Sequence, residues 1–79
     1  MISERLKRVL LEELELEEFD FQDETVASEV PGWDSLAHAR VLAAVEASFG
    51  VRLRARDILR IRNVGDLQQL VQARAAGAA

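Results

Sequence analysis

The chain has 79 residues, a formal net charge of −4 and one histidine, and it contains no cysteine. We expect residues 1–79 to form one domain, close to the size at which a single hydrophobic core only just offsets chain entropy. The absence of cysteine excludes disulfides, thiolate metal ligands and a cysteine nucleophile, and one histidine leaves little for a zinc site.

The first predicted element is an amphipathic helix that starts near Ile2. Its apolar residues recur at helical spacing: Ile2, Leu6, Val9, Leu10 and Leu14. Residues 20–32 have no sustained periodicity and are predicted to be a long connection. A loop of this length in so small a domain needs either a function or a hidden turn of helix. Apolar side chains are expected to hold it against the core: Phe19, Phe21, Val26 and Val30.

A second helix is predicted to begin between residues 33 and 35 and to end at residue 49. Pro31-Gly32 closes the connection, because proline cannot continue a helix and glycine relaxes the backbone. Either Asp34 or Ser35 can cap the first turn. Gly50 follows the helix, and glycine is the preferred residue just past a helix end. The long connection therefore delivers Ser35 to the start of this helix.

The following segment is predicted to be an extended linker and a short helix. Residues 51–56 alternate apolar and arginine residues, but no second strand is available to pair with them, so we expect a linker. Asp57 is expected to cap a short helical turn that includes Ile58, Leu59 and Ile61.

A last helix is predicted after Asn63, a good N-cap residue, with Asp66 placed as in a capping box. Its buried stripe is expected to consist of Val64, Leu67, Leu70 and Val71. Residues 73–79 are expected to fray. The elements together predict an all-α fold, a small four-helix bundle of three longer helices and one short helix, with a long loop between the first two.

The second helix carries two apolar strips. On a helical wheel one arc holds the expected core residues Val41, Leu42, Val45 and Phe49, with His38 beside them. The other arc cannot be buried by the same neighbours, and its members are Leu36, Ala39, Ala43 and Ala47, flanked by Arg40. The second strip is either a set of good helix formers or a docking face for a partner.

His38 and Trp33 are interpreted as structural residues. A lone histidine near a core arc is more often a satisfied packing residue than a ligand or base. Trp33 is expected to anchor the loop, with its indole N–H bonded to a carbonyl oxygen. We therefore predict no catalytic residue and no metal site in this chain.

Charge and hydropathy limit the class of partner. Residues 1–35 carry eleven Asp and Glu against three Lys and Arg, whereas residues 36–79 carry three against seven. The arginines of residues 52–62 lack aromatic interleaving and the chain as a whole is acidic, so we expect no nucleic-acid partner. The longest stretch without a charged residue, Leu67 to Ala73, is too short to span a bilayer, and Met1 is followed almost directly by charged residues. A cytoplasmic monomer that does not bind membranes is expected.

The sequence resembles the acyl carrier proteins, including the peptidyl and aminoacyl carriers. Asp34-Ser35-Leu36 resembles the Asp-Ser-Leu signature at the start of the second helix of that family. Four further features match at family-like spacing: Gly32, Glu46, Phe49-Gly50-Val51 and Asn63-Val64-Gly65-Asp66-Leu67. The resemblance covers essentially the whole chain, and its length is similar to that of a free-standing carrier.

The resemblance implies a covalent 4′-phosphopantetheine on Ser35, flanked by Asp34 and Leu36. A phosphopantetheinyl transferase would move this group from coenzyme A to the serine oxygen with Mg²⁺. The chain offers no recognisable base to activate the serine, so activation should come from the transferase and the chain should be a non-catalytic substrate. Acyl cargo would be carried as a thioester on the thiol of the prosthetic group.

One departure from the family concerns charge. Family members commonly carry several acids on the second helix, whereas the corresponding exposed positions here include Ala37, Arg40 and Ala47, with Glu46 remaining. We therefore expect dedicated loading enzymes in a specialised pathway such as polyketide or modified-lipid assembly. Two alternatives stay open: an aminoacyl or peptidyl carrier loaded by an adenylating ligase, and a helical interaction module in which Ser35 only caps the second helix.

Overall fold

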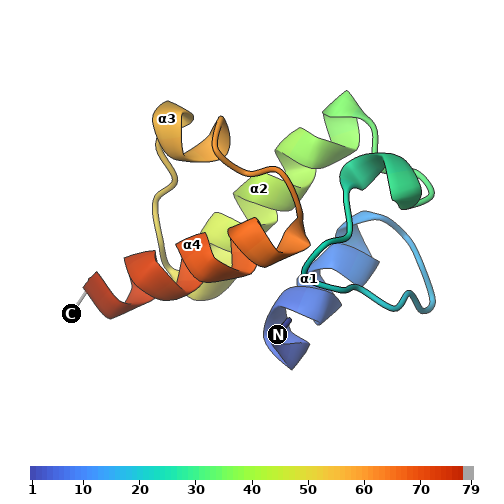
Figure 1. Ribbon diagram of the computed structural model, residues 1–79, viewed down its shortest axis with the longest axis horizontal. Coiled ribbons are helices and arrows are strands. Elements are labelled where there is room, and N and C mark those ends of the chain that lie inside the picture. Colours follow the sequence, from blue (N-terminus) through green and yellow to red (C-terminus); the bar gives the residue numbers. More distant parts are fainter. Residues whose placement is uncertain (78–79) are drawn as a thin grey trace.

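The structure is a computed structural model that describes residues 1–77, with side chains as far as residue 75. Its elements in chain order are α1 (Glu4–Glu13), the 3₁₀ turn η1 (Ala27–Glu29), α2 (Ser35–Phe49), α3 (Ala55–Ile58) and α4 (Val64–Gly77) (Figure 1). Residues 1–77 contain no strand. The predicted all-α fold, with three longer helices, one short helix and a long loop after the first, is confirmed.

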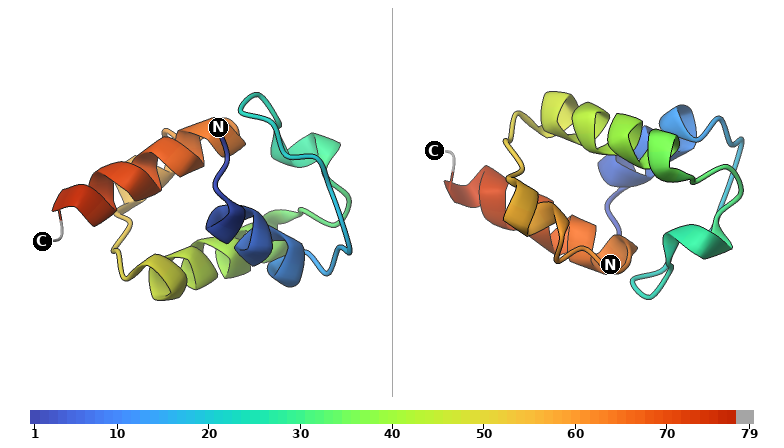
Figure 2. Two further views of the ribbon diagram at one scale, coloured as in Figure 1. Left: turned by 90° about the horizontal axis from the view of Figure 1, so that it is seen from below. Right: turned by 90° about the horizontal axis from the view of Figure 1, so that it is seen from above.

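The core lies where α2 packs against α1 on one side and α4 on the other. Eight side chains from these three helices are at most 1% exposed: Leu6, Leu10, Ala37, Val41, Val45, Val64, Leu67 and Val71. Burying a valine or leucine side chain contributes about 1.5–3 kcal/mol. The connection between α1 and α2 runs around the end of the bundle at which α2 begins (Figure 2).

The first helix begins and ends with local hydrogen bonds. The Ser3 hydroxyl accepts the backbone N–H of Leu6 at 3.2 Å, so the helix starts at Glu4 rather than at Ile2. Glu15 takes a left-handed conformation at φ 56°, which ends the helix.

The long connection contains the hidden turn of helix that its length required, and the turn is η1. The start of α4 holds the segment before this turn, because the N–H of Gly65 donates to Asp23 O and the N–H of Val64 donates to Thr25 O, both at 2.9 Å. A Cβ atom built on Gly65 would lie 2.8 Å from the carbonyl oxygen of Asp23. Glycine at position 65 therefore permits the loop backbone to approach α4 closely.

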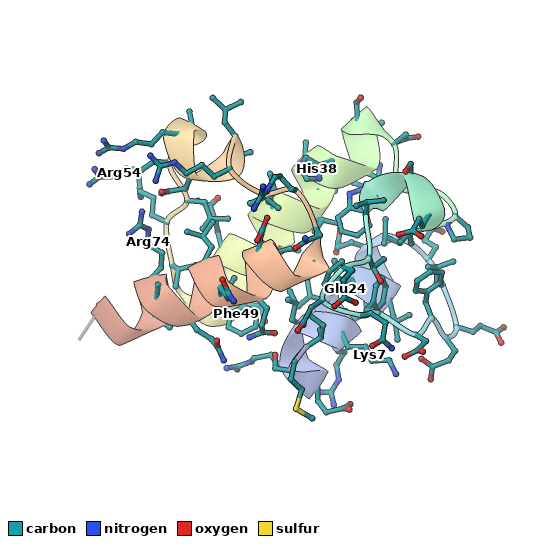
Figure 3. The ribbon with its side chains drawn as sticks, in the orientation of Figure 1. Lys7, Glu24, His38, Phe49, Arg54 and Arg74 are labelled. Carbon is teal, nitrogen blue, oxygen red and sulfur yellow. The ribbon has the colours of Figure 1, made fainter. Side chains whose placement is uncertain are left out.

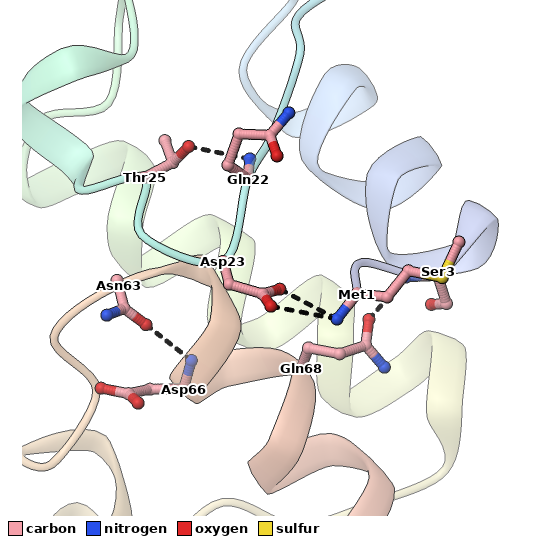
Figure 4. Close-up of polar contacts among 8 residues, drawn as sticks. All are labelled: Met1, Ser3, Gln22, Asp23, Thr25, Asn63, Asp66 and Gln68. Atoms are coloured by element: carbon pink, nitrogen blue, oxygen red, sulfur yellow. Dashed lines mark hydrogen bonds and ion pairs between the residues drawn. The ribbon is translucent and has the colours of Figure 1, made fainter.

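The N-terminal segment is tied to the same region (Figure 4). The amino group of Met1 lies 3.0 Å from a carboxylate oxygen of Asp23, and Ser3 N–H donates to the side-chain oxygen of Gln68 at 2.8 Å. Gln68 is only 4% exposed, so α4 buries a polar residue that the predicted apolar stripe did not include. Its hydrogen bond offsets the cost of burying the amide.

The prediction for the short helix was wrong at both ends. Asp57 was expected to cap it, but α3 begins at Ala55, with Arg54 as the N-cap residue and Asp57 inside the helix. The Asp57 carboxylate instead accepts the N–H of Arg54 at 3.2 Å. Ile61 lies beyond the helix, which ends at Ile58.

The last helix differs from its prediction in two details. Asn63 caps it as expected, accepting Asp66 N–H at 2.8 Å, but the Asp66 carboxylate accepts the N–H of Arg62 at 3.0 Å rather than that of the cap residue. Leu70 is only partly buried. Residues 73–79 were expected to fray; α4 is described as far as Gly77, and residues 78 and 79 lie outside the described residues.

Candidate functional site

The start of α2 is prepared by a tight turn. Gly32 has φ 80°, in the left-handed region that glycine adopts without strain, and the N–H of Trp33 donates to Val30 O at 3.2 Å. Val30 is 4% exposed and anchors the turn in the core. The sequence Val30-Pro31-Gly32 therefore reverses the chain immediately before Asp34.

Asp34 is the capping residue of α2, which decides between the two predicted candidates. Its carboxylate accepts the N–H of Ala37 at 2.8 Å, and its carbonyl accepts the N–H of His38 at 2.8 Å. Ser35 is the first residue of the helix and its side chain is exposed. Within residues 1–77 the Ser35 hydroxyl has no hydrogen-bond partner, so this hydroxyl is not the cap.

Trp33 and His38 form a polar contact beside Ser35. The indole N–H of Trp33 donates to Nδ1 of His38 at 3.0 Å, so the predicted bond to a carbonyl oxygen was wrong. The two rings are tilted by 33° with centroids 6.0 Å apart. The bond requires an unprotonated Nδ1, which makes His38 a satisfied packing residue of the kind the sequence indicated. Figure 3 shows His38 on the first half of α2.

A small cavity of about 50 Å³ lies beside this pair. Its lining comes from three parts of the chain and includes Trp33, His38, Ile61, Arg62 and Leu67. Pockets that hold small organic ligands usually measure about 300–1,000 Å³. The cavity therefore cannot accommodate an acyl chain without movement of its walls.

The second strip of α2 is exposed. Leu36 is 69% exposed, and the remaining members are exposed as well: Ala39, Arg40, Ala43 and Ala47. A large apolar side chain standing in solvent immediately after Ser35 is available to a partner.

Three other residues of α2 differ from expectation. Ala37, placed among the exposed positions, is 1% exposed and packs in the core. Phe49, placed on the core arc, is only partly buried, and the guanidinium of Arg5 lies 5.5 Å from its ring centroid. Glu46 was expected to be an acid available to partners, but its carboxylate accepts the N–H of Leu53 at 2.7 Å and holds the linker after α2.

The described residues 1–77 contain no group of three or more His, Cys, Asp or Glu side chains that could hold a metal ion. Over the same residues, no helix is both long enough and apolar enough to cross a membrane.

Comparison with known families identifies the chain. A family described as phosphopantetheine attachment site matches residues 4–71. The chain belongs to this family. Members carry a phosphopantetheine prosthetic group, so the cofactor predicted from the sequence is confirmed for this carrier domain.

A solved structure agrees with this assignment. The carrier domain superposes on the holo acyl carrier protein from Geobacter metallireducens with a TM-score of 0.87 and 25% sequence identity, over 92% of this chain and 84% of the other. The resemblance to acyl carrier proteins is therefore confirmed. No match was found among curated protein sequences.

The residues at the start of α2 fit a phosphopantetheine group. The N–H groups of Ala37 and His38 bind Asp34, whereas those of Ser35 and Leu36 have no partner within residues 1–77. Unpaired N–H groups and the helix dipole favour a phosphate at this end of the helix, while the Asp34 carboxylate opposes it. The Ser35 side chain is exposed, so an arm attached there would extend into solvent.

Two side-chain pairs could not be predicted from the sequence, one beside Ser35 and one between α3 and α4. Trp33 and His38 are five residues apart, a spacing that is not a helical neighbour relation, so nothing in the pattern paired them. Arg74 lies in the segment that was expected to fray, and its Nη2 lies 2.6 Å from the Asp57 carboxylate and joins α4 to α3. The two residues belong to consecutive helices, and only the way these helices lie against each other could reveal the pair.

Proposed function

We propose that Ser35 is the attachment point of 4′-phosphopantetheine and that this protein carries acyl groups as thioesters on the thiol of that arm. The observation that supports the proposal best is the division of roles at the start of α2. The Asp34 carboxylate caps the helix at 2.8 Å, so the exposed Ser35 hydroxyl is not needed for capping. A serine that only capped the helix would be occupied by a backbone N–H.

The attachment requires another enzyme, a phosphopantetheinyl transferase. A serine hydroxyl is a weak nucleophile unless a base accepts its proton. His38, the single histidine, accepts the indole N–H of Trp33 through Nδ1 and sits in a packing role. In the proposed transfer the Ser35 oxygen bonds to the phosphorus of the phosphopantetheine group, the pyrophosphate bond of coenzyme A breaks, adenosine 3′,5′-bisphosphate leaves, and a base of the transferase takes the serine proton. The chain is thus a substrate rather than an enzyme.

The strip formed by Leu36, Ala39, Arg40, Ala43 and Ala47 is proposed as the surface that the transferase and the loading enzymes contact. Its large apolar member, Leu36, stands next to the attachment serine and is 69% exposed. Helix recognition commonly uses such an apolar anchor beside the group that is presented. The arginine on this face favours dedicated loading enzymes in a specialised pathway over enzymes that recognise acidic carriers.

Intact mass spectrometry tests the attachment. Incubation with a promiscuous phosphopantetheinyl transferase, coenzyme A and Mg²⁺ should add about 340 Da, the mass of the phosphopantetheine group. Ser35→Ala should abolish the gain, and Ser28→Ala, at another exposed serine, should retain it. No gain in the natural chain, or a gain that survives Ser35→Ala, would contradict the proposal and favour a helical interaction module.

The cargo is tested with the holo protein. Acyl-adenylating and aminoacyl-adenylating ligases are offered in parallel, and the thioester product is identified by mass. We expect an acyl product. An aminoacyl product obtained with comparable efficiency would instead identify an aminoacyl or peptidyl carrier with the same attachment serine.

A further inference from the structure

An arginine-lined cleft lies between α3 and α4. It has a volume of about 430 Å³, and its lining residues are Arg52, Arg54, Arg56, Asp57, Arg60 and Arg74. Figure 3 shows the labelled Arg54 and Arg74 on this side of the molecule. Five guanidinium groups thus line this cleft together with a single carboxylate.

The one carboxylate is already engaged within the fold. Asp57 Oδ2 lies 2.6 Å from Arg74 Nη2 and accepts the backbone N–H of Arg54 at 3.2 Å. Asp57 is 9% exposed, so it faces the protein rather than solvent. The remaining arginines have no ion pair within residues 1–77: Arg52, Arg54, Arg56 and Arg60. Apart from the Asp57 carboxylate, solvent and salt relieve their mutual repulsion until an acidic group binds.

A large exposed apolar side chain directly precedes one of these arginines in the chain. Leu59, at the C-terminal end of α3, is 84% exposed and is followed directly by Arg60. Arginine is enriched at protein interfaces, where apolar contacts accompany it, and guanidinium groups bind carboxylates with two parallel hydrogen bonds. A phosphate ion or a nucleic-acid backbone would make no use of Leu59, and the chain as a whole carries a net charge of −4.

We propose that an arginine surface, defined as Arg52, Arg54, Arg56, Leu59 and Arg60, docks an acidic surface of a partner protein. Leu59 supplies the apolar contact and the guanidinium groups pair with Asp and Glu of the partner. The Asp57–Arg74 ion pair holds α3 against α4, so the arginines are presented from a fixed position. In Figure 1, α3 and the start of α2 lie along the same edge of the molecule, so one partner can reach both. The proposal does not depend on modification of Ser35.

Photocrosslinking in the natural host tests the docking. Leu59→p-benzoylphenylalanine is introduced into the full chain, and the cells are irradiated. The crosslinked peptide of the partner is sequenced. The same residue at Arg8, exposed on α1, serves as the control position. We expect a defined partner peptide rich in Asp and Glu that crosslinks at position 59 and not at position 8.

Charge reversal then decides whether the arginines carry the contact. Arg56→Glu with Arg60→Glu should lower the crosslink yield roughly tenfold, because like charges would face each other, while Arg56→Gln with Arg60→Gln should lower it less. Replacing the crosslinked acids of the partner by Lys should restore the yield with the reversed variant. Circular dichroism checks that both variants remain helical.

Three results would overturn the proposal: no specific crosslink at position 59, a crosslink to nucleic acid, or a protein crosslink that the charge-reversed variant retains. The mass gain on Ser35 is measured separately in each variant. If the natural chain does not take the prosthetic group but gives the specific crosslink at position 59, the proposed function is contradicted and the docking surface is supported.

Discussion

Trp33 donates its indole N–H to Nδ1 of His38 at 3.0 Å, and this bond joins a residue before Ser35 in the chain to a residue after it. One partner belongs to the turn before α2 and the other to the first turns of the helix. The pair therefore links the loop that delivers Ser35 to the helix that presents it.

Replacing His38 should loosen this link. His38→Leu would leave the half-buried indole N–H without an acceptor, at a cost of about 1–3 kcal/mol in the free energy of unfolding, whereas His38→Asn offers an amide oxygen near the position of Nδ1 and should cost less. Urea denaturation gives the energies, and the fluorescence of Trp33, the single tryptophan, reports its hydration. Equal losses in both variants would show that packing alone matters at this position.

Leu36 and Val45 should separate partner binding from stability. Leu36 is 69% exposed, so Leu36→Ala should leave helical circular dichroism and the free energy of unfolding nearly unchanged while reducing modification by the transferase. Val45 is 0% exposed, and Val45→Ala should cost about 2 kcal/mol because it leaves a cavity in the core. If Leu36→Ala unfolds the protein, the strip on α2 is not a free face. Phe49→Ala should cost less than its predicted core position implied, since Phe49 is only partly buried.

Gly65 gives a prediction with an unexpected sign. On helix propensity alone, Gly65→Ala should stabilise a helix by about 1 kcal/mol. A Cβ at this position would instead lie 2.8 Å from the carbonyl oxygen of Asp23 and 2.9 Å from its Cβ, so the substitution must displace the loop. We expect a net loss of about 1–3 kcal/mol by urea denaturation. Stabilisation would show that the loop can move away from α4 without cost.

The Asp57–Arg74 pair should make stability depend on pH. The hydrogen bond from Arg74 holds the pKa of Asp57 below its ordinary value of 3.8. Because the folded state has the lower pKa, the stabilisation is complete above the ordinary pKa and is lost as the pH falls through the lowered value. Asp57→Asn should therefore lower the Tm at about pH 7, and the difference from the natural chain should shrink toward about pH 2.

The control for this titration is Glu17→Gln, at an exposed carboxylate. It should leave the Tm nearly unchanged at both pH values. Thermal melts followed by circular dichroism provide the measurement. A difference between the natural chain and Asp57→Asn that stays constant on acidification would show that the ion pair does not stabilise the fold.

The sequence by itself determined the elements that depend on neighbouring residues. The apolar spacing after Ile2 and between Val41 and Val45 predicted two of the long helices, because one face of a helix repeats every 3.6 residues. Asn63 and Gly50 marked helix ends through short-range hydrogen bonds and backbone freedom. Asp34-Ser35-Leu36, with its surroundings, predicted the family and its prosthetic group through a resemblance of motif and spacing, which can be recognised without the fold.

The tertiary structure decided what depends on residues far apart in the chain. The structure also chose between two local candidates for the cap of α2, because Asp34 takes that role and leaves the Ser35 hydroxyl free of it. Among distant residues, it joined Arg74 to Asp57 across two helices and Gly65 to the Asp23 carbonyl. Such contacts follow from how helices cross, and no local periodicity records a crossing. The cleft shows the same division: its arginines between residues 52 and 60 are neighbours in the sequence, but only the tertiary structure adds Arg74 of α4 to its lining.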